Sequence, residues 1–328
     1  MADGKARSLK HSMKLPVIMA PMFLISKPKM VVEACVNGIA GTFPALNART
    51  GEDLEKWMEE ISTSLEKRRR EDPTATVAPW GINFIVHRSN KRYEEDLKRI
   101  GRYQPPIVIT SLGDPSPVIK VVHEYGGTVF SDVINPTFAR KAVEKGADGL
   151  ILVANGAGGH AGVLNPVSFL HEVREFFDGP VVLGGGLSKG EDILAAEVLG
   201  ADFAYMGTRF IPTAESAAPE EYKEMIVDSA IEDIIYTDAF SGIHANYLIP
   251  SITKAGLDPS KLEKKEEINF NKSGSDTKAW KDIWGAGHGI GSIRNIQTVA
   301  EIVAELDDSY QKAVDRLERR FNLQGSRP

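Results

Sequence analysis

The sequence predicts an α/β fold, a (β/α)8 TIM barrel with a mostly helical insertion after the eighth strand. Eight short apolar runs alternate with amphipathic segments between residues 16 and 206. Glycine or proline bounds most of the runs, and a more polar pattern replaces the repeat after residue 211. This alternation is typical of a closed parallel barrel, and an open doubly wound sheet is the structural alternative. The number of strands and the positions of the glycine-rich motifs favour the barrel.

The predicted strands are apolar without a clear polar alternation. Strands buried on both faces of a parallel sheet have this pattern, because helices cover the sheet on each side. They cover Pro16–Ala20, Ile39–Phe43, Trp80–Phe84, Ile107–Thr110, Gly127–Ser131, Gly149–Ala154, Pro180–Gly184 and Asp202–Met206.

Amphipathic helices are predicted between these strands. Several begin with proline, whose missing N–H costs nothing in the first turn of a helix. Several end at glycine, the usual residue after a helix C-terminus: Gly38, Gly101, Gly126, Gly146 and Gly200. A Gly-Ala-Asp triplet recurs at residues 146–148 and 200–202, at the same place in two βα units. The predicted helices are Pro28–Asn37, Glu52–Arg70, Lys91–Gly101, Pro115–Tyr125, Pro136–Lys145, Pro166–Phe177 and Glu191–Leu199.

The chain beyond the eighth strand divides into an insertion and a return to the barrel. We expect residues 1–212 to form the barrel and residues 213–285 to form an inserted subdomain that contributes to substrate binding or acts as a lid. Residues 286–328 would return to the barrel with a closing segment and a long amphipathic last helix over Ile296–Phe321. The tail over 322–328 is predicted to be disordered.

Charge and composition exclude several classes of partner. The formal net charge is -6, which disfavours nucleic acid because phosphate binding needs a basic face. The single cysteine, Cys35, lies in an apolar helical stretch and is expected to pack in the core. No disulfide framework, signal peptide or membrane-length apolar run is recognisable, so we expect a cytoplasmic protein with no membrane partner. No metal-ligand spacing appears, and no metal is expected.

Two glycine-rich strand ends predict a phosphate site. The seventh strand runs into Gly184, Gly185 and Gly186, and Gly207 and Thr208 follow the eighth strand. In TIM barrels these two loops form the standard phosphate cradle, because glycine lets backbone N–H groups approach the phosphate oxygens. The alternative is that these glycines only form tight turns.

A histidine among small residues predicts chemistry at the end of the sixth strand. His160 follows Gly159, itself a candidate cofactor-binding residue, in the run Ala-Gly-Gly-His-Ala-Gly over residues 157–162. We expect an exposed imidazole at the barrel mouth that titrates near neutral pH, as a general base or an anion-binding group. A structural role for this histidine is the alternative.

Other strand ends supply small or polar groups that could contact a bound ring: Ala20, Pro21, Met22, Asn83 and Ser111. Taken alone, each of them could equally be a turn residue whose polar groups are hydrogen-bonded locally. The late segment around His288 is also glycine-rich and could fold over the mouth, contributing to substrate binding, or serve as a hinge.

Taken together, these motifs resemble the nitronate monooxygenase family, FMN-containing barrels related to the flavin-dependent enoyl-ACP reductases. The resemblance rests on residues 16–22, 80–84, 157–162, 185–186, 206–210 and 286–288, and it covers nearly the whole chain. It implies FMN as the cofactor, with its phosphate on Gly185, Gly186, Gly207 and Thr208. It also implies that Met22 and Asn83 lie near the flavin ring and that His160 is the catalytic base or orients an anion.

By this resemblance the chain oxidises alkyl nitronates, small-molecule substrates, with O2. An NAD(P)H-dependent flavin reductase acting on a quinone or an enoyl thioester is the main alternative, and the motifs are shared by both. Two further functions stay open: a non-redox barrel that binds a sugar phosphate, and a catalytically inactive binding protein. A homo-oligomer is also open.

The sequence departs from the family at two positions. Gly156 stands where many relatives have glutamate, and Asp132 stands near the fifth strand where some have a lysine that helps to hold the phosphate. Asp132 would repel a phosphate, so that contact must be replaced or absent.

Overall fold

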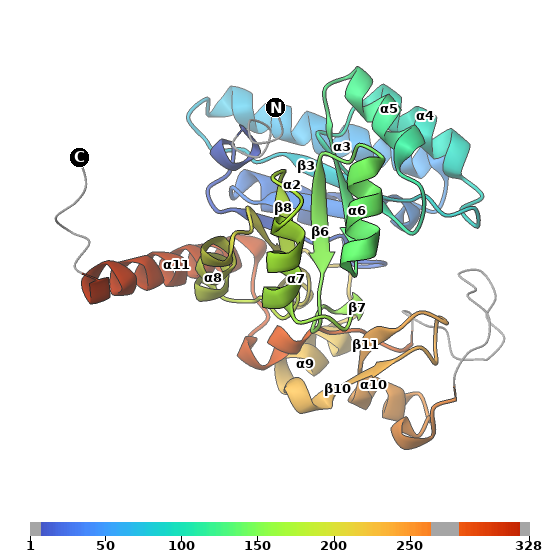
Figure 1. Ribbon diagram of the computed structural model, residues 1–328, viewed down its shortest axis with the longest axis vertical. Coiled ribbons are helices and arrows are strands. Elements are labelled where there is room, and N and C mark those ends of the chain that lie inside the picture. The colour runs from blue at the N-terminus through green and yellow to red at the C-terminus, as the bar shows by residue number, and fades with distance from the viewer. Residues whose placement is uncertain (1–7, 264–281, 322–328) are drawn as a thin grey trace.

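The computed structural model describes residues 8–263 and 282–321, and these form a closed eight-stranded parallel barrel wrapped by helices (Figure 1). The prediction of a (β/α)8 TIM barrel is confirmed, with the strand order β1-β2-β3-β4-β5-β6-β8-β9. The barrel closes where β1 pairs with β9, through Val17 opposite Ala204 and Met19 opposite Met206. The predicted tail over 322–328 and part of the predicted insertion lie outside the described residues.

Each predicted strand forms close to its expected bounds. The barrel strands are β1 (Val17–Met19), β2 (Ala40–Pro44), β3 (Trp80–Ile85), β4 (Ile107–Ser111), β5 (Thr128–Val133), β6 (Gly149–Val153), β8 (Val181–Gly184) and β9 (Phe203–Met206). Ile109, Phe130 and Ile151 point into the barrel and are fully buried there with neighbours from the other strands. Side chains from the outer faces pack against the helices, so both faces of the sheet are buried as the apolar runs predict.

The helices follow the strands in the expected order. They are α2 (Pro28–Val36), α3 (Gly51–Glu71), α4 (Tyr93–Tyr103), α5 (Ser116–Glu124), α6 (Pro136–Glu144), α7 (Pro166–Arg174), α8 (Gly190–Leu199) and α11 (Val299–Phe321). The helix expected to end at Gly101 continues to Tyr103 and ends at Gln104, which has a φ of 52°. The last helix begins at Val299 because Thr298 and Glu301 cap it reciprocally, each side chain accepting a hydrogen bond from the other residue's N–H.

The repeated Gly-Ala-Asp triplet has one physical explanation at both places. Gly146 and Gly200 take positive φ after a helix, and each aspartate then caps the start of a neighbouring strand. Asp148 accepts from the N–H of Val129, and Asp202 accepts from the N–H of Val181, each at 2.8 Å. The triplet therefore stabilises the end of the barrel opposite the predicted site.

The insertion contains strands as well as the expected helices. Its described elements are α9 (Glu220–Asp228), β10 (Ile234–Thr237), β11 (Ala245–Leu248) and α10 (Ile249–Lys254), with short 3-10 turns between them. The strands β10 and β11 form an antiparallel sheet with β7 (Gly159–His160), a two-residue strand from the loop after β6. In Figure 1 the arrow of β6 points toward this subdomain, which lies over the C-terminal end of the barrel.

Two further features bear on the expectations from composition. Cys35 is fully buried, and burial raises the pKa of its thiol to about 12, which fits a packing role. Within residues 8–263 and 282–321, no helix has the length and apolarity needed to cross a bilayer.

Candidate active site

A cavity of about 1950 Å³ opens at the C-terminal end of the barrel. Every barrel strand contributes to its wall, either within the strand or at its end, and the insertion contributes Phe240, Ser241 and Ile243. All the predicted cofactor-binding residues line this cavity together with His160, whereas His288 does not. The structure thus gathers residues that are scattered from position 20 to position 208 of the sequence.

The two glycine-rich strand ends lie side by side in this cavity. Gly185 and Gly186 have φ values of 141° and 74°, a backbone shape that only glycine adopts without strain. The backbone N–H groups of Gly185, Gly186 and Thr208 have no hydrogen-bond acceptor within the described part of the chain. All three residues are half-buried in the wall of the cavity, so these donors are available to an anion there.

The arginine of this second loop is hydrogen-bonded outside the cavity. Arg209 is buried, and its guanidinium donates to Glu305 on α11 at 2.6 Å and to Gln297 at 3.1 Å. It does not line the cavity. The side chain instead ties the strand end to the last helix.

The late glycine-rich segment, residues 285–292, packs against both loops. The N–H of Gly287 donates to the Thr208 hydroxyl at 2.8 Å, and the N–H of His288 donates to the carbonyl of Gly156 at 2.9 Å. A Cβ on Gly287 would lie 2.6 Å from that same carbonyl, so only glycine fits this close approach. The backbone of this segment covers the two glycine-rich loops at the ends of β8 and β9. The half-buried His288 ring packs against Gly156.

His160 is held by the insertion rather than by the barrel. In β7 it pairs with Ala245 of β11, and Asn246 donates a side-chain hydrogen bond to the carbonyl of Ala157 at 2.7 Å. The imidazole Nε2 lies 3.4 Å from the Ser241 hydroxyl.

The expected titration of His160 near neutral pH is wrong. Its side chain is partly buried, and burial lowers the pKa of the imidazole to about 4, because protein replaces the water that would solvate the charged form. His160 is therefore a neutral imidazole at physiological pH.

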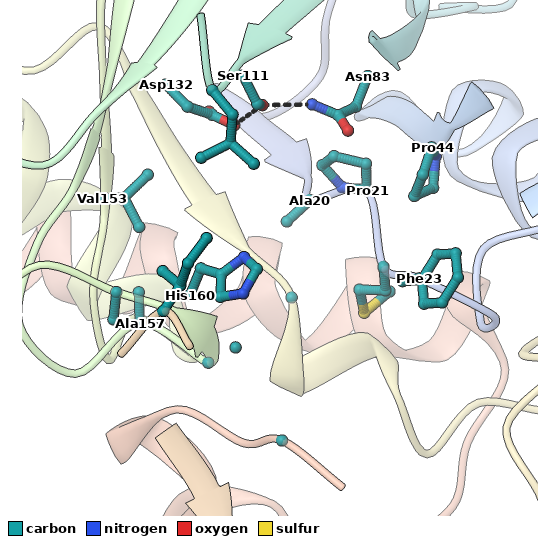
Figure 2. A pocket seen from close by; sticks show the side chains of 18 of the residues that line it. Ala20, Pro21, Phe23, Pro44, Asn83, Ser111, Asp132, Val153, Ala157 and His160 are labelled. Atoms are coloured by element: carbon teal, nitrogen blue, oxygen red, sulfur yellow. Dashed lines mark hydrogen bonds between the residues drawn. The ribbon is translucent and has the colours of Figure 1, made fainter. Parts of the chain in front are cut away.

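A chain of hydrogen bonds runs across the strand ends β3, β4 and β5. The Asn83 amide donates to the Ser111 hydroxyl at 2.7 Å, and Ser111 donates to the Asp132 carboxylate at 2.5 Å. Figure 2 shows this chain along one side of the pocket and His160 on another side. Burial raises the pKa of Asp132 to about 6, although the bond from Ser111 opposes that shift. Asp132 lies on β5, and the part of the chain that the structure describes places no lysine beside it for a phosphate.

Sequence reasoning missed Tyr205 in this region. Tyr205 lines the cavity from β9, and burial together with the charge of Asp132 raises the pKa of its phenol well above the usual value. In the sequence it is part of the apolar run over residues 202–206. The alternation of sides along β9 could have placed it inside the barrel, but nothing local places it beside an aspartate on β5.

The loop after β1 completes the wall. Ala20, Pro21 and Met22 line the cavity, and a Cβ on Gly207 would be in ordinary contact with Ala20 at 3.5 Å. Asn47 fixes this loop, since its amide donates to the carbonyl of Met22 at 3.0 Å. The loop after β1 therefore lies directly beside the second glycine loop.

The cavity fits the parts of a flavin mononucleotide. The unpaired N–H groups suit an anionic tail, the apolar wall at Pro21 and Met22 suits a flat ring, and the Asn83–Ser111–Asp132 chain offers polar atoms to a ring edge. Within the two described ranges, no group of three histidine, cysteine, aspartate or glutamate side chains is placed to hold a metal ion.

Comparison with known proteins places this arrangement in a family. The family model described as nitronate monooxygenase matches residues 6–308. The chain is 24% identical to a nitronate monooxygenase of Paraburkholderia phytofirmans, over 94% of this chain and 95% of that protein.

Two other proteins are similar to this chain, one in sequence and one in fold. A Rhodococcus jostii protein named (3aS,4S,5R,7aS)-5-hydroxy-7a-methyl-1-oxo-octahydro-1H-indene-4-carboxyl-CoA dehydrogenase is 28% identical over 70% of this chain and 61% of its own length. The structure of FabK from Thermotoga maritima superimposes with a TM-score of 0.76 at 23% identity, covering 95% of this chain and 98% of that one.

Proposed function

The chain belongs to the nitronate monooxygenase family, and from this membership we propose that it is an FMN-dependent oxidoreductase that oxidises alkyl nitronates with O2. The observation that carries the proposal is the pairing of two features in one cavity. Unpaired backbone donors lie at the ends of β8 and β9, and a neutral histidine lies in β7, in the loop after β6.

The proposed cofactor is FMN because it joins one phosphate to a flat ring. In this proposal the N–H groups of Gly185, Gly186 and Thr208 donate to the phosphate, and the loop over residues 20–22 packs against the ring. Asn83 and Ser111 offer hydrogen bonds at the ring edge. FMN supplies the electron-transfer chemistry when bound, and the protein supplies position and electrostatics.

His160 is proposed to move a proton. As a neutral imidazole it accepts a proton from the α-carbon of a neutral nitroalkane at Nε2 or Nδ1, and the resulting imidazolium attracts the nitronate anion. Ser241, 3.4 Å from Nε2, orients the ring, so the insertion contributes to the chemistry of the site.

Spectroscopy and oxygen uptake test the proposal. The purified protein should be yellow, or become so with added FMN, and should consume O2 when given an alkyl nitronate without any nicotinamide. A colourless protein that takes up no flavin from excess FMN would contradict the cofactor assignment. It would favour a non-redox barrel whose cradle holds a substrate phosphate.

An NAD(P)H-dependent flavin reductase that acts on a quinone or an enoyl thioester is the second candidate. A relative named for the dehydrogenation of a CoA thioester supports it. Rapid NAD(P)H oxidation in the presence of quinone or enoyl-CoA, with no nitronate turnover, would establish this candidate instead.

A further inference from the structure

Polar side chains form part of the floor of the cavity. An apolar layer fills the barrel interior and includes Ile109, Phe130, Ile151 and Phe203. Successive side chains of a strand point to opposite faces, so the residues two positions further along each strand point the same way and form the next layer. That layer lines the cavity with Ser111, Asp132, Val153 and Tyr205. Asp132 is therefore a carboxyl group set directly above an apolar layer.

The negative charge of Asp132 is poorly compensated within residues 8–263 and 282–321. The Ser111 hydroxyl donates to Oδ2 at 2.5 Å, whereas Oδ1 is buried and has no hydrogen-bond partner in these ranges. On β6 Val153 is apolar, and on β9 Tyr205 stays a neutral phenol, because burial and the charge of Asp132 raise its pKa. Burial disfavours the ionised form of a carboxyl with one bare oxygen, and it raises the pKa of Asp132 to about 6.

The charged groups on the neighbouring elements are engaged elsewhere. The helices α5 and α6 cover the outer face of β5, away from the inward side chain of Asp132. On α6 and just after it, Lys141 lies over the Phe138 ring, and Lys145 pairs with Asp114 at 3.2 Å. In the described part of the chain, Asp132 is therefore neutralised by a proton rather than by a cation.

The direction of the hydrogen bonds at Ser111 depends on this proton. The Asn83 amide donates both to the carbonyl of Ile109 at 3.3 Å and to the Ser111 hydroxyl at 2.7 Å, and a carbonyl can only accept. The Ser111 oxygen thus receives a bond from Asn83, and its single hydrogen goes either to Asp132 or into the cavity. A proton on Oδ2 of Asp132 would itself donate to the Ser111 oxygen, so the Ser111 hydrogen would then point to a ligand.

We propose that Asp132 is a positioning residue that takes up a proton when negative charge forms on the edge of the bound FMN ring, and that Ser111 then donates to that edge. The proton comes from solvent and forms the O–H bond at Oδ2, and no electron passes to or from Asp132. The inference rests on the proposed function and extends it by naming the groups that balance charge at the ring. This proton is separate from the one that His160 accepts from the substrate, because the two groups lie on different sides of the pocket (Figure 2).

The midpoint potential of the bound FMN, measured against pH, tests the proposal. The pKa of Asp132 is about 6, and negative charge on the ring raises this pKa further. Below about pH 6, Asp132 carries its proton both before and after reduction. Above that pH only reduction protonates it, so reduction of the parent takes up about one more proton than reduction of Asp132→Asn. The potential of the parent should therefore fall more steeply with pH than that of the variant above about pH 6, and the two should converge near about pH 5.

Two further variants separate this role from a structural one. Asp114→Asn removes an exposed carboxylate from the wall of the same cavity and should keep the potential–pH profile of the parent. Its amide oxygen can still accept from the N–H of Ser116, as the carboxylate does. Ser111→Ala should lower the potential at about pH 5 as well, because the hydroxyl that donates to the ring edge is gone.

Infrared difference spectroscopy detects the proton directly and needs only the parent. At about pH 7.5, reduction should produce the C=O band of a protonated carboxylic acid, which shifts when the aspartates carry a carboxyl isotope label. The band should be absent from Asp132→Asn. Parallel potential–pH lines for the parent and Asp132→Asn, or reduction of the labelled parent without this band, would overturn the inference and leave the FMN assignment in place. A parent that takes up no FMN would instead overturn the proposed function, and the inference with it.

Discussion

At the scale of single residues, the position of His160 was predictable and its acidity was not. The Ala-Gly-Gly-His run after an apolar strand places the histidine at the barrel mouth on local grounds alone. The pKa of about 4 depends on the protein packed around the ring, including Ser241, which is 81 residues further along the chain. The pKa shifts of Asp132 and Tyr205 are equally unpredictable from the sequence, because burial and neighbours from other strands cause them.

The acidity of His160 has a measurable consequence for the pH profile. A general base acts only when deprotonated, so activity on a neutral nitroalkane should fall as pH drops through about 4 rather than through the usual value near 6.5. Between about pH 7.5 and pH 5, kcat/KM should change by less than about twofold, whereas a solvent-exposed histidine would give a loss of about 30-fold. His160→Asn should lower this activity by at least about 100-fold at all these pH values. Full activity of the variant would remove His160 from the mechanism.

At the scale of elements, the barrel strands and helices followed from the sequence because each is defined locally. Proline at helix starts, glycine at helix ends and buried apolar runs are signals that a few residues carry. The sequence does not predict β10 and β11, because each has only four residues, too few to show a strand pattern, and they pair with each other and, through β11, with the distant two-residue β7. The sequence shows that the closing segment is glycine-rich. Only the structure shows that this segment contacts Thr208 and Gly156 through the backbone of Gly287.

The closing segment yields a paired prediction. Gly287→Ala places a methyl group 2.6 Å from the Gly156 carbonyl and 2.9 Å from the Gly158 N–H, so the segment must shift away from the cradle. We expect a loss of about 1–3 kcal/mol in stability and about a tenfold weaker affinity for FMN. Gly291→Ala, in the same segment, meets nothing within 4 Å and should change stability by less than about 0.5 kcal/mol. Thermal unfolding and flavin fluorescence titration measure both effects, and equal behaviour of the two variants would contradict this account.

At the scale of the whole molecule, the last helix joins the two ends of the barrel. α11 packs against α8 and α2, and Arg209 at the end of β9 pairs with Glu305 on it. The backbones of α8 and α11 meet at Gly190, whose N–H donates to the Ser309 hydroxyl at 2.9 Å. The sequence predicted that a long amphipathic helix would close the barrel. The crossing point could not be predicted, because it depends on two segments more than a hundred residues apart.

The crossing of α8 and α11 predicts a large effect of one methyl group. A Cβ on Gly190 would lie 2.2 Å from the backbone N of Tyr310 and 2.3 Å from the carbonyl of Leu306. Neither backbone atom can move without displacing α11, so Gly190→Ala should cost about 2–3 kcal/mol of unfolding free energy. Chemical denaturation, with Gly291→Ala as the tolerated glycine substitution, measures this difference. A denaturation curve that matches that of the parent would contradict this account, because it would show that α8 and α11 can move apart without a loss of unfolding free energy.

The pairing of β7 with β11 has a consequence for transplanting loops among relatives. Specificity in barrel enzymes is often exchanged by swapping a loop while the reactive groups stay on the scaffold. In this protein the edge strand that carries His160 takes its hydrogen bonds from Ala245 and Asn246 of the insertion. A chimera that received the 213–285 segment of another protein would inherit a different support for its histidine. The reactivity of the histidine in the chimera would therefore change together with the substrate specificity of the chimera.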